Sequence, residues 1–383
     1  MRFLHVIASL SPESGGPSEA MRQLTGRYQD FGDEAEFVCQ DDPGSPFLAN
    51  VPVPVNPVGA RSGTYGYSRN LLRWLKENVS RFDGVIVNGI WTYSSLAAAI
   101  AARGRVPYAV FTHGMLDPWF KRRYPLKHLK KQLYWPLQYP VLSHAGAVLF
   151  TSAMERDLAP KSVWPNKWNG VVVPYGAGDP TGDPQAHLEA LYSRLPQLRG
   201  RRYLLFMSRI HEKKGCDLLI QAFARIAADH PTVDLVVAGP DQVGLQSKLQ
   251  KMAQDLGIER RVHWPGMLKG DAKYGALRAC DAFILPSHQE NFGVVVAEAL
   301  ACGRPVLISN QVNIWREIEQ EGVGLVAPDT LDGTQTLLSR WLSLDDASRA
   351  VMVDRTAATF RKNYSMRSAA GAIHDLFLKL TRA

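Results

Sequence analysis

The sequence has few cysteines and no long hydrophobic run, and these absences exclude several classes of protein. Its 383 residues include four cysteines, at positions 39, 216, 280 and 302, with no Cys-x-x-Cys pair and no histidine cluster nearby. A zinc site and a disulfide framework are therefore not indicated, and a reducing compartment fits best. Because no window is apolar enough to span a membrane, we expect a soluble protein. The apolar start is short and contains His5, so we interpret it as a buried strand and not as a signal peptide.

Two patterns of nucleotide-dependent enzymes are also absent. No Gly-x-Gly-x-x-Gly follows a strand-like segment in either half, which disfavours a nicotinamide oxidoreductase. The chain lacks the Asp-x-Asp pattern of metal-dependent sugar transferases, and we expect neither a metal nor another cofactor. Positive charge, in contrast, is in excess, since 44 Lys and Arg against 36 Asp and Glu give a net charge of +8. This excess favours phosphorylated ligands, anionic membrane surfaces or nucleic acid as partners.

Short apolar segments, each followed by a helix-like stretch, recur along the whole chain. They are residues 3–8, 84–87, 108–111, 147–150, 171–173, 203–207, 235–238, 282–285, 305–308 and 325–327. This alternation predicts parallel βαβ units, and the chain is longer than one hydrophobic core usually organises. We therefore predict an α/β fold with two doubly wound, Rossmann-like domains that face each other across a cleft.

The expected boundaries follow from composition. The first domain covers residues 1–178 and the second covers residues 203–362. Residues 179–202 carry several Pro, Gly and polar residues and no convincing strand, so we interpret them as an interdomain linker. Ligands of such sheets bind beyond the carboxyl ends of the strands, and the chemistry is expected there.

A basic loop follows the first expected strand of the second domain. It reads Ser-Arg-Ile-His-Glu-Lys-Lys-Gly over residues 208–215 and leads into a helix. Free N–H groups and the helix dipole already favour an anion at a helix N-terminus. Arg209 can bind phosphate oxygens in a bidentate manner, and Lys214 supplies a compact positive charge. We interpret the loop as a diphosphate clamp; the alternative is that both residues are solvated surface charges.

A second candidate cluster spans residues 286–298 and holds two carboxylates. Glu290 is expected in a strand-end loop, and Glu298 inside the helix that follows. Carboxylates accept hydrogen bonds from sugar and ribose hydroxyls, and Asn291, Phe292 and Gly293 would offer main-chain N–H groups to phosphate. A surface salt bridge would explain Glu298 equally well.

The order of these motifs along the chain resembles that of the retaining nucleotide-sugar glycosyltransferases of glycosyltransferase family four, which have the GT-B fold. The matching series is Arg-x-x-x-x-Lys-Gly, Gly-Pro-Asp at 239–241, Val-His-Trp-Pro-Gly at 262–266, and Pro-Ser-x-x-Glu-x-x-Gly with a second glutamate. The resemblance covers the whole chain in layout, and its specific motifs lie between residues 208 and 304. It also implies that the C-terminal helix, within residues 363–383, packs back on the first domain.

The resemblance implies a role for each matching residue. Arg209 and Lys214 would bind the donor diphosphate, Glu298 the ribose, and Glu290 the hydroxyls of the donor sugar. Residues 263–268 would form the base-binding loop through main-chain groups. Many family members have Gly-x-Gly-Pro where this chain has Val-Ala-Gly-Pro-Asp at 237–241, so no role is carried over to Asp241.

The first domain matches through two short motifs. Gly15 and Gly16 join the first strand to a helix, and glycines there allow close approach of phosphate or acceptor; a plain tight turn is the alternative. His113 follows the strand that ends at Phe111, where the family has an active-site histidine loop. A buried structural histidine is the alternative reading.

A basic and aromatic stretch lies between these motifs. Residues 119–135 contain Lys, Arg and aromatic side chains and no acidic residue. This composition is typical of a surface helix that rests on anionic lipid, while a solvated basic face is the alternative. We expect no nucleic acid partner, and a cytoplasmic protein that can sit peripherally at the inner face of the cytoplasmic membrane.

Together these features predict a retaining glycosyltransferase. It would move a sugar from a UDP-type or GDP-type donor to a hydroxyl of a glycan or lipid-linked acceptor, in surface polysaccharide biosynthesis. Catalysis would involve His113, Glu290, Arg209 and Lys214, with the leaving diphosphate accepting the proton of the acceptor hydroxyl. The alternatives are a nucleotide-sugar epimerase or a sugar phosphorylase of the same fold, or a nucleotide-binding protein without catalysis.

Overall fold

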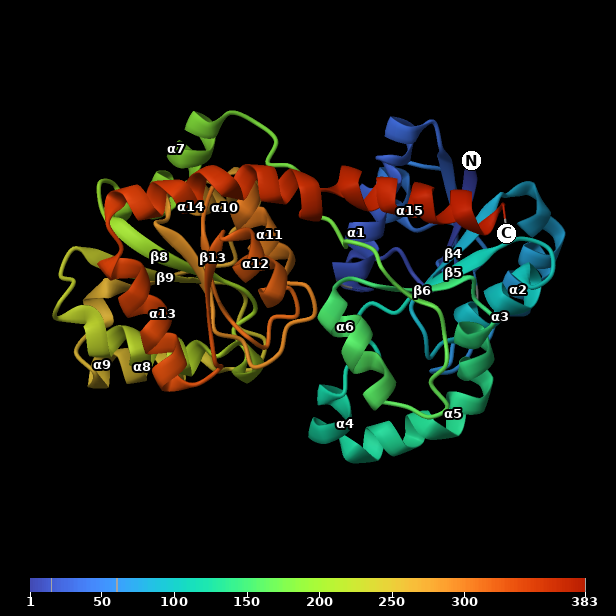
Figure 1. Ribbon diagram of the computed structural model, residues 1–383, viewed down its shortest axis with the longest axis horizontal. Coiled ribbons are helices and arrows are strands. Elements are labelled where there is room, and N and C mark those ends of the chain that lie inside the picture. Colours follow the sequence, from blue (N-terminus) through green and yellow to red (C-terminus); the bar gives the residue numbers. More distant parts are fainter. Residues whose placement is uncertain (15, 60, 383) are drawn as a thin grey trace. The chain divides into compact units, whose positions relative to one another are not determined.

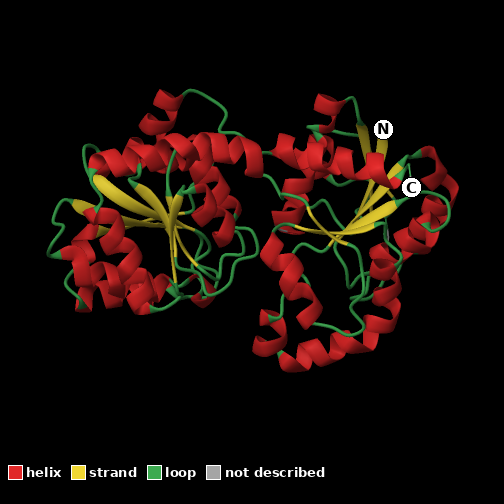
Figure 2. Cartoon of the chain, in the orientation of Figure 1, coloured by secondary structure: helices red, strands yellow, loops and turns green. Residues whose placement is uncertain are grey.

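The computed structural model describes residues 1–14, 16–59 and 61–382. The chain forms two compact units. The first consists of Met1–Gly176 and Met366–Ala383, and the second of Ala177–Ser365. In each unit a central sheet is covered by helices on both faces (Figures 1 and 2). The predicted α/β class with two Rossmann-like sheets is confirmed.

The first unit contains a seven-stranded sheet in which every pairing is parallel, in the order β3-β2-β1-β4-β5-β6-β7. Its strands are β1 Arg2–Ile7, β2 Glu34–Cys39, β3 Val55–Pro57, β4 Gly84–Asn88, β5 Tyr108–Phe111, β6 Ala147–Phe150 and β7 Gly170–Val172. Its helices are α1 Gly16–Thr25, α2 Arg69–Asn78, α3 Tyr93–Ala102, α4 Trp119–Arg123, α5 Pro125–Ser143, α6 Ala153–Leu158 and α15 Met366–Leu380.

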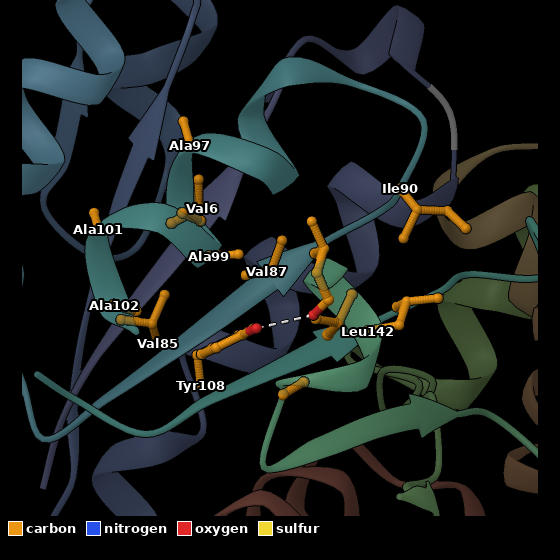
Figure 3. Close-up of a cluster of buried hydrophobic side chains, with 14 of the residues drawn as sticks. Val6, Val85, Val87, Ile90, Ala97, Ala99, Ala101, Ala102, Tyr108 and Leu142 are labelled. Carbon is orange, nitrogen blue, oxygen red and sulfur yellow. Dashed lines mark hydrogen bonds between the residues drawn. The ribbon is translucent and has the colours of Figure 1, made fainter. Parts of the chain in front are cut away.

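The two faces of this sheet are covered by different helices because side chains alternate along each strand. On one face, Leu4 and Val85 join a core with side chains of α2, α3 and α5. Tyr108 is part of this core, and its hydroxyl donates to the carbonyl of Val141 in α5 at 3.0 Å (Figure 3). On the other face, Phe3 packs on Phe377 of α15, with ring centroids 5.0 Å apart. The C-terminal helix α15 thus belongs to the first unit.

The second unit contains a six-stranded sheet, again parallel throughout, in the order β10-β9-β8-β11-β12-β13. Its strands are β8 Arg202–Met207, β9 Val233–Ala238, β10 Val262–Gly266, β11 Ala282–Leu285, β12 Val306–Ser309 and β13 Gly324–Ala327. Its helices are α7 Pro184–Arg194, α8 Cys216–Ala227, α9 Gln246–Asp255, α10 Gly270–Ala279, α11 Val294–Ala301, α12 Trp315–Glu321, α13 Leu331–Ser343 and α14 Asp346–Thr359.

The stretch expected to be a linker, residues 179–202, is instead part of the second unit. Asp183 accepts hydrogen bonds from the backbone N–H groups of Gln185 and Ala186 and so caps α7. The helix packs on α10 so closely that a Cβ on Gly275 would lie 2.0 Å from the carbonyl oxygen of His187. The polar composition of this stretch reflects the exposed side of a packed helix.

Candidate functional site

Lys214 and Glu290 form an ion pair at the carboxyl end of the second sheet. Lys214 ends a 3-10 turn, Glu212–Lys214, that follows β8, and its side chain is buried. Its Nζ contacts Oε2 of Glu290, in the loop that follows the neighbouring strand β11. Oε1 of Glu290 accepts from the backbone N–H of Asn291 at 3.1 Å. The structure therefore brings together two of the residues that the motifs selected.

The two loops that carry this pair are joined by backbone contacts. The carbonyl of Lys213 accepts from the N–H of His288 and from the hydroxyl of Ser287, each at 2.9 Å. Gly215 has a φ of 66°, and a Cβ there would lie 2.1 Å from the carbonyl oxygen of Pro286. Only glycine permits both this backbone conformation and this approach. The loops are thus locked so that Lys214 faces Glu290.

Arg209 contacts a different residue, Gln242, and not the ion pair. The side chain is exposed, and Nη1 donates to Oε1 of Gln242 at 3.4 Å. The adjacent Asp241 accepts from the backbone N–H groups of Val243, Leu245 and Gln246. These bonds, the one from Gln246 first, lower the pKa of Asp241, and the carboxylate organises the turn before α9. Arg209 therefore presents an exposed cation in the loop after β8, at the carboxyl end of the sheet.

Glu298 is buried in α11 and pairs with a residue that the motifs did not single out. Nζ of Lys273, in α10, donates to Oε1 of Glu298 at 2.7 Å. The surface salt bridge considered for Glu298 thus exists in a buried form. Lys273 lies 25 positions away in sequence, and no local spacing connects the two residues. A ligand hydroxyl that binds Glu298 would share the carboxylate with this lysine.

The start of α11 presents main-chain donors. Gly293 precedes the helix with a φ of 73°, and the first N–H groups of a helix have no acceptor within it. The side chain of Phe292 is buried, with its ring 5.9 Å from that of Tyr364. Phe292 therefore packs its ring in the core, and the predicted phosphate contact would involve its main-chain N–H.

The expected base-binding segment is partly strand. His263 lies in β10, and its Nε2 is 3.0 Å from Oδ2 of Asp234. Asp234 also receives a bidentate bond from Arg201, at 2.7 Å for each contact. His263 is therefore part of a structural ion-pair network, whereas Met267 is exposed beyond the strand.

His113 lies directly after β5 of the first unit in an unusual conformation. Its φ is 49°, a left-handed value that residues other than glycine rarely adopt. The ring stacks on Phe111 with centroids 5.1 Å apart, and burial lowers the pKa of His113 to about 3. Both ring nitrogens are buried without a hydrogen-bond partner among the described residues. A neutral imidazole with two unsatisfied nitrogens is suited to receive a polar ligand group.

Glu155 holds the loop that carries His113. Its Oε1 accepts from the hydroxyl of Thr112 at 2.9 Å and from the N–H of Gly114 at 2.8 Å. Its Oε2 accepts from the N–H and the hydroxyl of Thr151, each at 2.7 Å. The N–H of Glu155 in turn donates to the hydroxyl of Ser152 at 3.1 Å, which caps α6. The bonds to the histidine loop were missed because they cross 41 and 43 positions.

The glycine motif of the first unit gives less information. Gly15 lies outside the described residues. Gly16 begins α1, and a Cβ added to it would meet no atom within 4 Å. Steric demand therefore does not explain Gly16, whereas Ser18 of the same motif is buried and donates to the carbonyl of Ser9 at 2.9 Å.

The basic stretch forms α4 and most of α5, which lie at the periphery of the first unit (Figure 1). Trp135 and Gln138 face the protein and are buried. The opposite side of α5 exposes a row of leucines, which we name the leucine face: Leu126, Leu129, Leu133 and Leu137. Their exposed fractions are 76%, 64%, 78% and 48%, so the helix presents apolar side chains to its surroundings in addition to lysines.

The four cysteines are free and buried, and burial raises the pKa of Cys216 to about 12. Across residues 1–14, 16–59 and 61–382, no group of three or more His, Cys, Asp or Glu side chains is arranged to hold a metal ion. In the same part of the chain, no helix combines the length and apolar character needed to cross a membrane.

Two family models match the chain, one in each half. Residues 193–358 match "Glycosyl transferases group 1", and residues 15–176 match "Glycosyl transferase 4-like domain". Curated relatives include the D-inositol 3-phosphate glycosyltransferases of Salinispora tropica, 31% identical over 207 residues, and of Saccharomonospora viridis, 32% identical over 183 residues. These alignments cover 52% and 45% of this chain. The chain spans 42% of the length of either relative.

Solved structures of the same fold cover the whole chain. The Anabaena protein Alr3699/HepE, in complex with UDP, aligns with a TM-score of 0.75 and 19% identity over 99% of this chain and 100% of its own. A glycosyltransferase from Rickettsia africae aligns with a TM-score of 0.76 and 16% identity over 99% and 98% of the two chains. At these identities the likeness establishes the fold, which is a pair of Rossmann-like domains.

Proposed function

This chain resembles the GT-B glycosyltransferases in both of its halves, and from that premise we propose that it is a retaining glycosyltransferase. It moves a sugar from a nucleoside diphosphate sugar of the UDP or GDP type to a hydroxyl of a glycan or lipid-linked acceptor. Support for the donor class comes from the Anabaena neighbour, whose structure contains UDP. Support for a phosphorylated acceptor comes from relatives named for D-inositol 3-phosphate.

The observation that carries this proposal is the pairing of Lys214 with Glu290 beside the start of α11. In the proposed complex, Lys214 meets the donor diphosphate, and Glu290 accepts from hydroxyls of the donor sugar. Glu290 thus fixes the ammonium group before the donor arrives. The N–H groups around Gly293 and the exposed Arg209 complete the anion site, each charge-assisted bond being worth about 1.5–3 kcal/mol.

The chemistry follows from the charge of the leaving group. As the glycosidic bond breaks, its electron pair stays on the diphosphate oxygen, and positive charge develops at the anomeric carbon. Cations and helix N–H groups at the diphosphate therefore stabilise the transition state more than the ground state. The acceptor oxygen attacks from the face that the diphosphate leaves, and the diphosphate accepts the acceptor proton, so the anomeric configuration is retained.

His113 acts in this scheme as a neutral positioning group for a sugar hydroxyl. Because the pKa of His113 is lowered to about 3, its imidazole carries no charge at neutral pH and is a weak base. It can still donate one hydrogen bond and accept another. Glu155 keeps the histidine in place through the bonds to Thr112 and Gly114.

We propose that the leucine face of α5 contacts an anionic membrane surface and that the enzyme acts at the inner face of the cytoplasmic membrane, in surface polysaccharide assembly. Exposed leucines lie beside Lys127 and Lys130, and no acidic residue occurs from residue 119 to residue 143. Apolar side chains would enter the lipid boundary while the lysines meet anionic headgroups. Each basic residue near such a surface contributes about 1 kcal/mol.

A thermal-shift screen with UDP, GDP, ADP and dTDP tests the donor class, followed by transfer assays with sugars of the best nucleotide. We expect one nucleotide to raise Tm and Arg209→Ala to suppress transfer without unfolding the protein. Normal turnover by this variant would refute the diphosphate assignment. Product formation without acceptor would indicate an epimerase, and a requirement for inorganic phosphate would indicate a phosphorylase.

A further inference from the structure

A cavity of about 190 Å³ lies on the first unit between the loop of residues 62–67, the end of β4 and helix α5. Its walls are aromatic and basic: Thr64, Tyr65, Trp91, Lys130, Lys131 and Tyr134. We name it the Trp91 pocket. No acidic residue lines it, so its chemistry favours an anion next to a ring or an apolar group.

The Trp91 pocket is joined to the histidine loop. Trp91 follows β4, and His113 follows the adjacent strand β5. The indole Nε1 of Trp91 donates to the carbonyl of Met115 at 3.3 Å, two residues beyond His113. A ligand in the pocket would therefore lie beside the carboxyl edge of the sheet, where α/β sheets bind their ligands.

The walls of the pocket are fixed by buried hydrogen bonds. Trp91 has a φ of 72°, a conformation that persists only where the surrounding structure holds it. The fully buried Gln138 accepts from the N–H of Trp91 at 3.2 Å and donates to the hydroxyl of Tyr65 at 2.9 Å. Tyr65 in turn stacks on Tyr134 with ring centroids 5.5 Å apart. The pocket is thus preorganised.

Two ammonium groups are available to an anion in this pocket. Nζ of Lys131 lies 5.2 Å from the ring centroid of Trp91, and Lys130 is exposed at the rim. Neither lysine forms an ion pair with a carboxylate among the described residues. An incoming phosphate would therefore meet two unpaired positive charges without displacing an acidic side chain.

Lys130, at the rim of the Trp91 pocket, lies on the same side of α5 as the leucine face. Lys130 lies four positions after Leu126, three before Leu133 and seven before Leu137, so these side chains share one side of α5. A phosphate held at Lys130 and Lys131 would leave any attached apolar chain along exposed leucines. The pocket and the leucine face together fit a molecule with both parts.

We propose that the Trp91 pocket is an acceptor subsite that binds the phosphate group of a lipid phosphate, with the apolar chain along the leucine face. This inference rests on the proposed function, because it names the acceptor class of that site. It adds no chemical step, since the pocket binds and orients the acceptor while the transfer chemistry stays at the donor diphosphate.

Calorimetric titration of the full chain tests the proposal with two probes, monomeric dihexanoyl phosphatidic acid and glycerol 3-phosphate. We expect the lipid phosphate to bind more tightly, and Lys130→Gln combined with Lys131→Gln to weaken it ~tenfold or more. Lys131→Arg, which keeps the charge, and Lys167→Gln, which removes an exposed lysine elsewhere on the unit, should bind as the parent does.

Each result separates the pocket from the donor site. Unchanged lipid-phosphate binding in the double variant overturns the proposal, while nucleotide binding together with sugar transfer by the parent protein would still support the proposed function. Equal, lysine-dependent affinity for both probes overturns the lipid part and indicates a soluble phosphorylated acceptor. If no nucleotide raises Tm, the proposed function fails, and the titration still decides whether the pocket binds a lipid phosphate.

Discussion

The ammonium group of Lys214 contacts the carboxylate of Glu290 across 76 positions of sequence. The contact joins the loops that follow two adjacent parallel strands, β8 and β11. The side chain of Lys214 is 7% exposed and that of Glu290 is 22% exposed, so water screens the pair only in part. The side chain of Lys214 is therefore already ordered in the folded protein, and binding of an anion does not have to fix it.

Replacement of Lys214 should lower both sugar transfer and stability. Lys214→Ala should reduce transfer ~10²–10³-fold, because one stabilising charge at the leaving group is lost. It should also lower the free energy of unfolding by about 1–3 kcal/mol, since Glu290 loses its partner. Transfer rates and urea denaturation measure both effects. Lys248→Ala, at an exposed lysine of the same unit, is the control, and equal losses in the two variants would contradict the assignment.

Gly215 should tolerate no side chain. A Cβ at this position meets the carbonyl of Pro286 at 2.1 Å, so Gly215→Ala must push apart the loops that hold Lys214 and Glu290. We expect a loss of stability of more than ~1 kcal/mol and loss of nucleotide binding. Gly257→Ala is a matched control, because Gly257 has a φ of 69° and no atom within 4 Å of the added Cβ. Urea denaturation should show that Gly257→Ala lowers the free energy of unfolding by only ~1 kcal/mol. An equal loss of stability in both variants would contradict the role of the clash.

Buried neutral histidine makes stability depend on pH. The folded-state pKa of His113 is lowered to about 3 from 6.5, so its contribution is complete above pH 6.5 and is lost as pH falls toward 3. His113→Asn removes this contribution and keeps a residue that tolerates positive φ. Between these two pKa values, the stability of the parent should fall more steeply than that of the variant, by about 1.4 kcal/mol per pH unit. Denaturant titrations at several pH values measure the difference, and parallel curves would show that His113 is not buried in neutral form.

Glu155 should act through the histidine loop. Glu155→Gln replaces one of the two acceptor oxygens with an NH2 group that can only donate, so either Thr112 and Gly114 or Thr151 lose their acceptor, and we expect the loop to loosen and transfer to fall. Ser152→Ala removes only the cap of α6 and should cost about 0.5–2 kcal/mol of stability. If Glu155 positions the histidine loop, Glu155→Gln should lower kcat, whereas Ser152→Ala should leave kcat unchanged at a similar loss of stability. Equal kcat values in the two variants would show that Glu155 contributes to stability only.

The leucine face can be tested on vesicles. Leu129→Gln combined with Leu133→Gln should reduce sedimentation with anionic liposomes at low salt, because the apolar contact is lost while all lysines remain. Val351→Gln, at a 52% exposed residue of the second unit, provides the control. If the parent protein does not sediment with such liposomes, or if the double variant sediments equally well, the membrane contact proposed for α5 is wrong.

The sequence by itself determined the fold class and the order of the strand-end loops. The apolar segments at 3–8, 84–87, 108–111 and 147–150 coincide with β1, β4, β5 and β6 to within a residue, because central parallel strands are buried on both faces. Strands β2, β3 and β10 were not predicted. Two of them are edges of their sheets, and β2 carries Glu34 and Glu36 in alternation with apolar residues, so none reads as an apolar run.

Only the tertiary structure decided which charges meet. Glycine, capping and helix-start signals are local, so the loops of Lys214, Glu290 and Gly293 could be found from spacing along the chain. The partner of Glu298 at Lys273, the support of His113 by Glu155, and the pocket at Trp91 join segments whose separation leaves no periodic trace. Such contacts depend on the pairing of strands and the packing of helices, because a charge is stabilised by what lies near it in space and not by its neighbours in sequence.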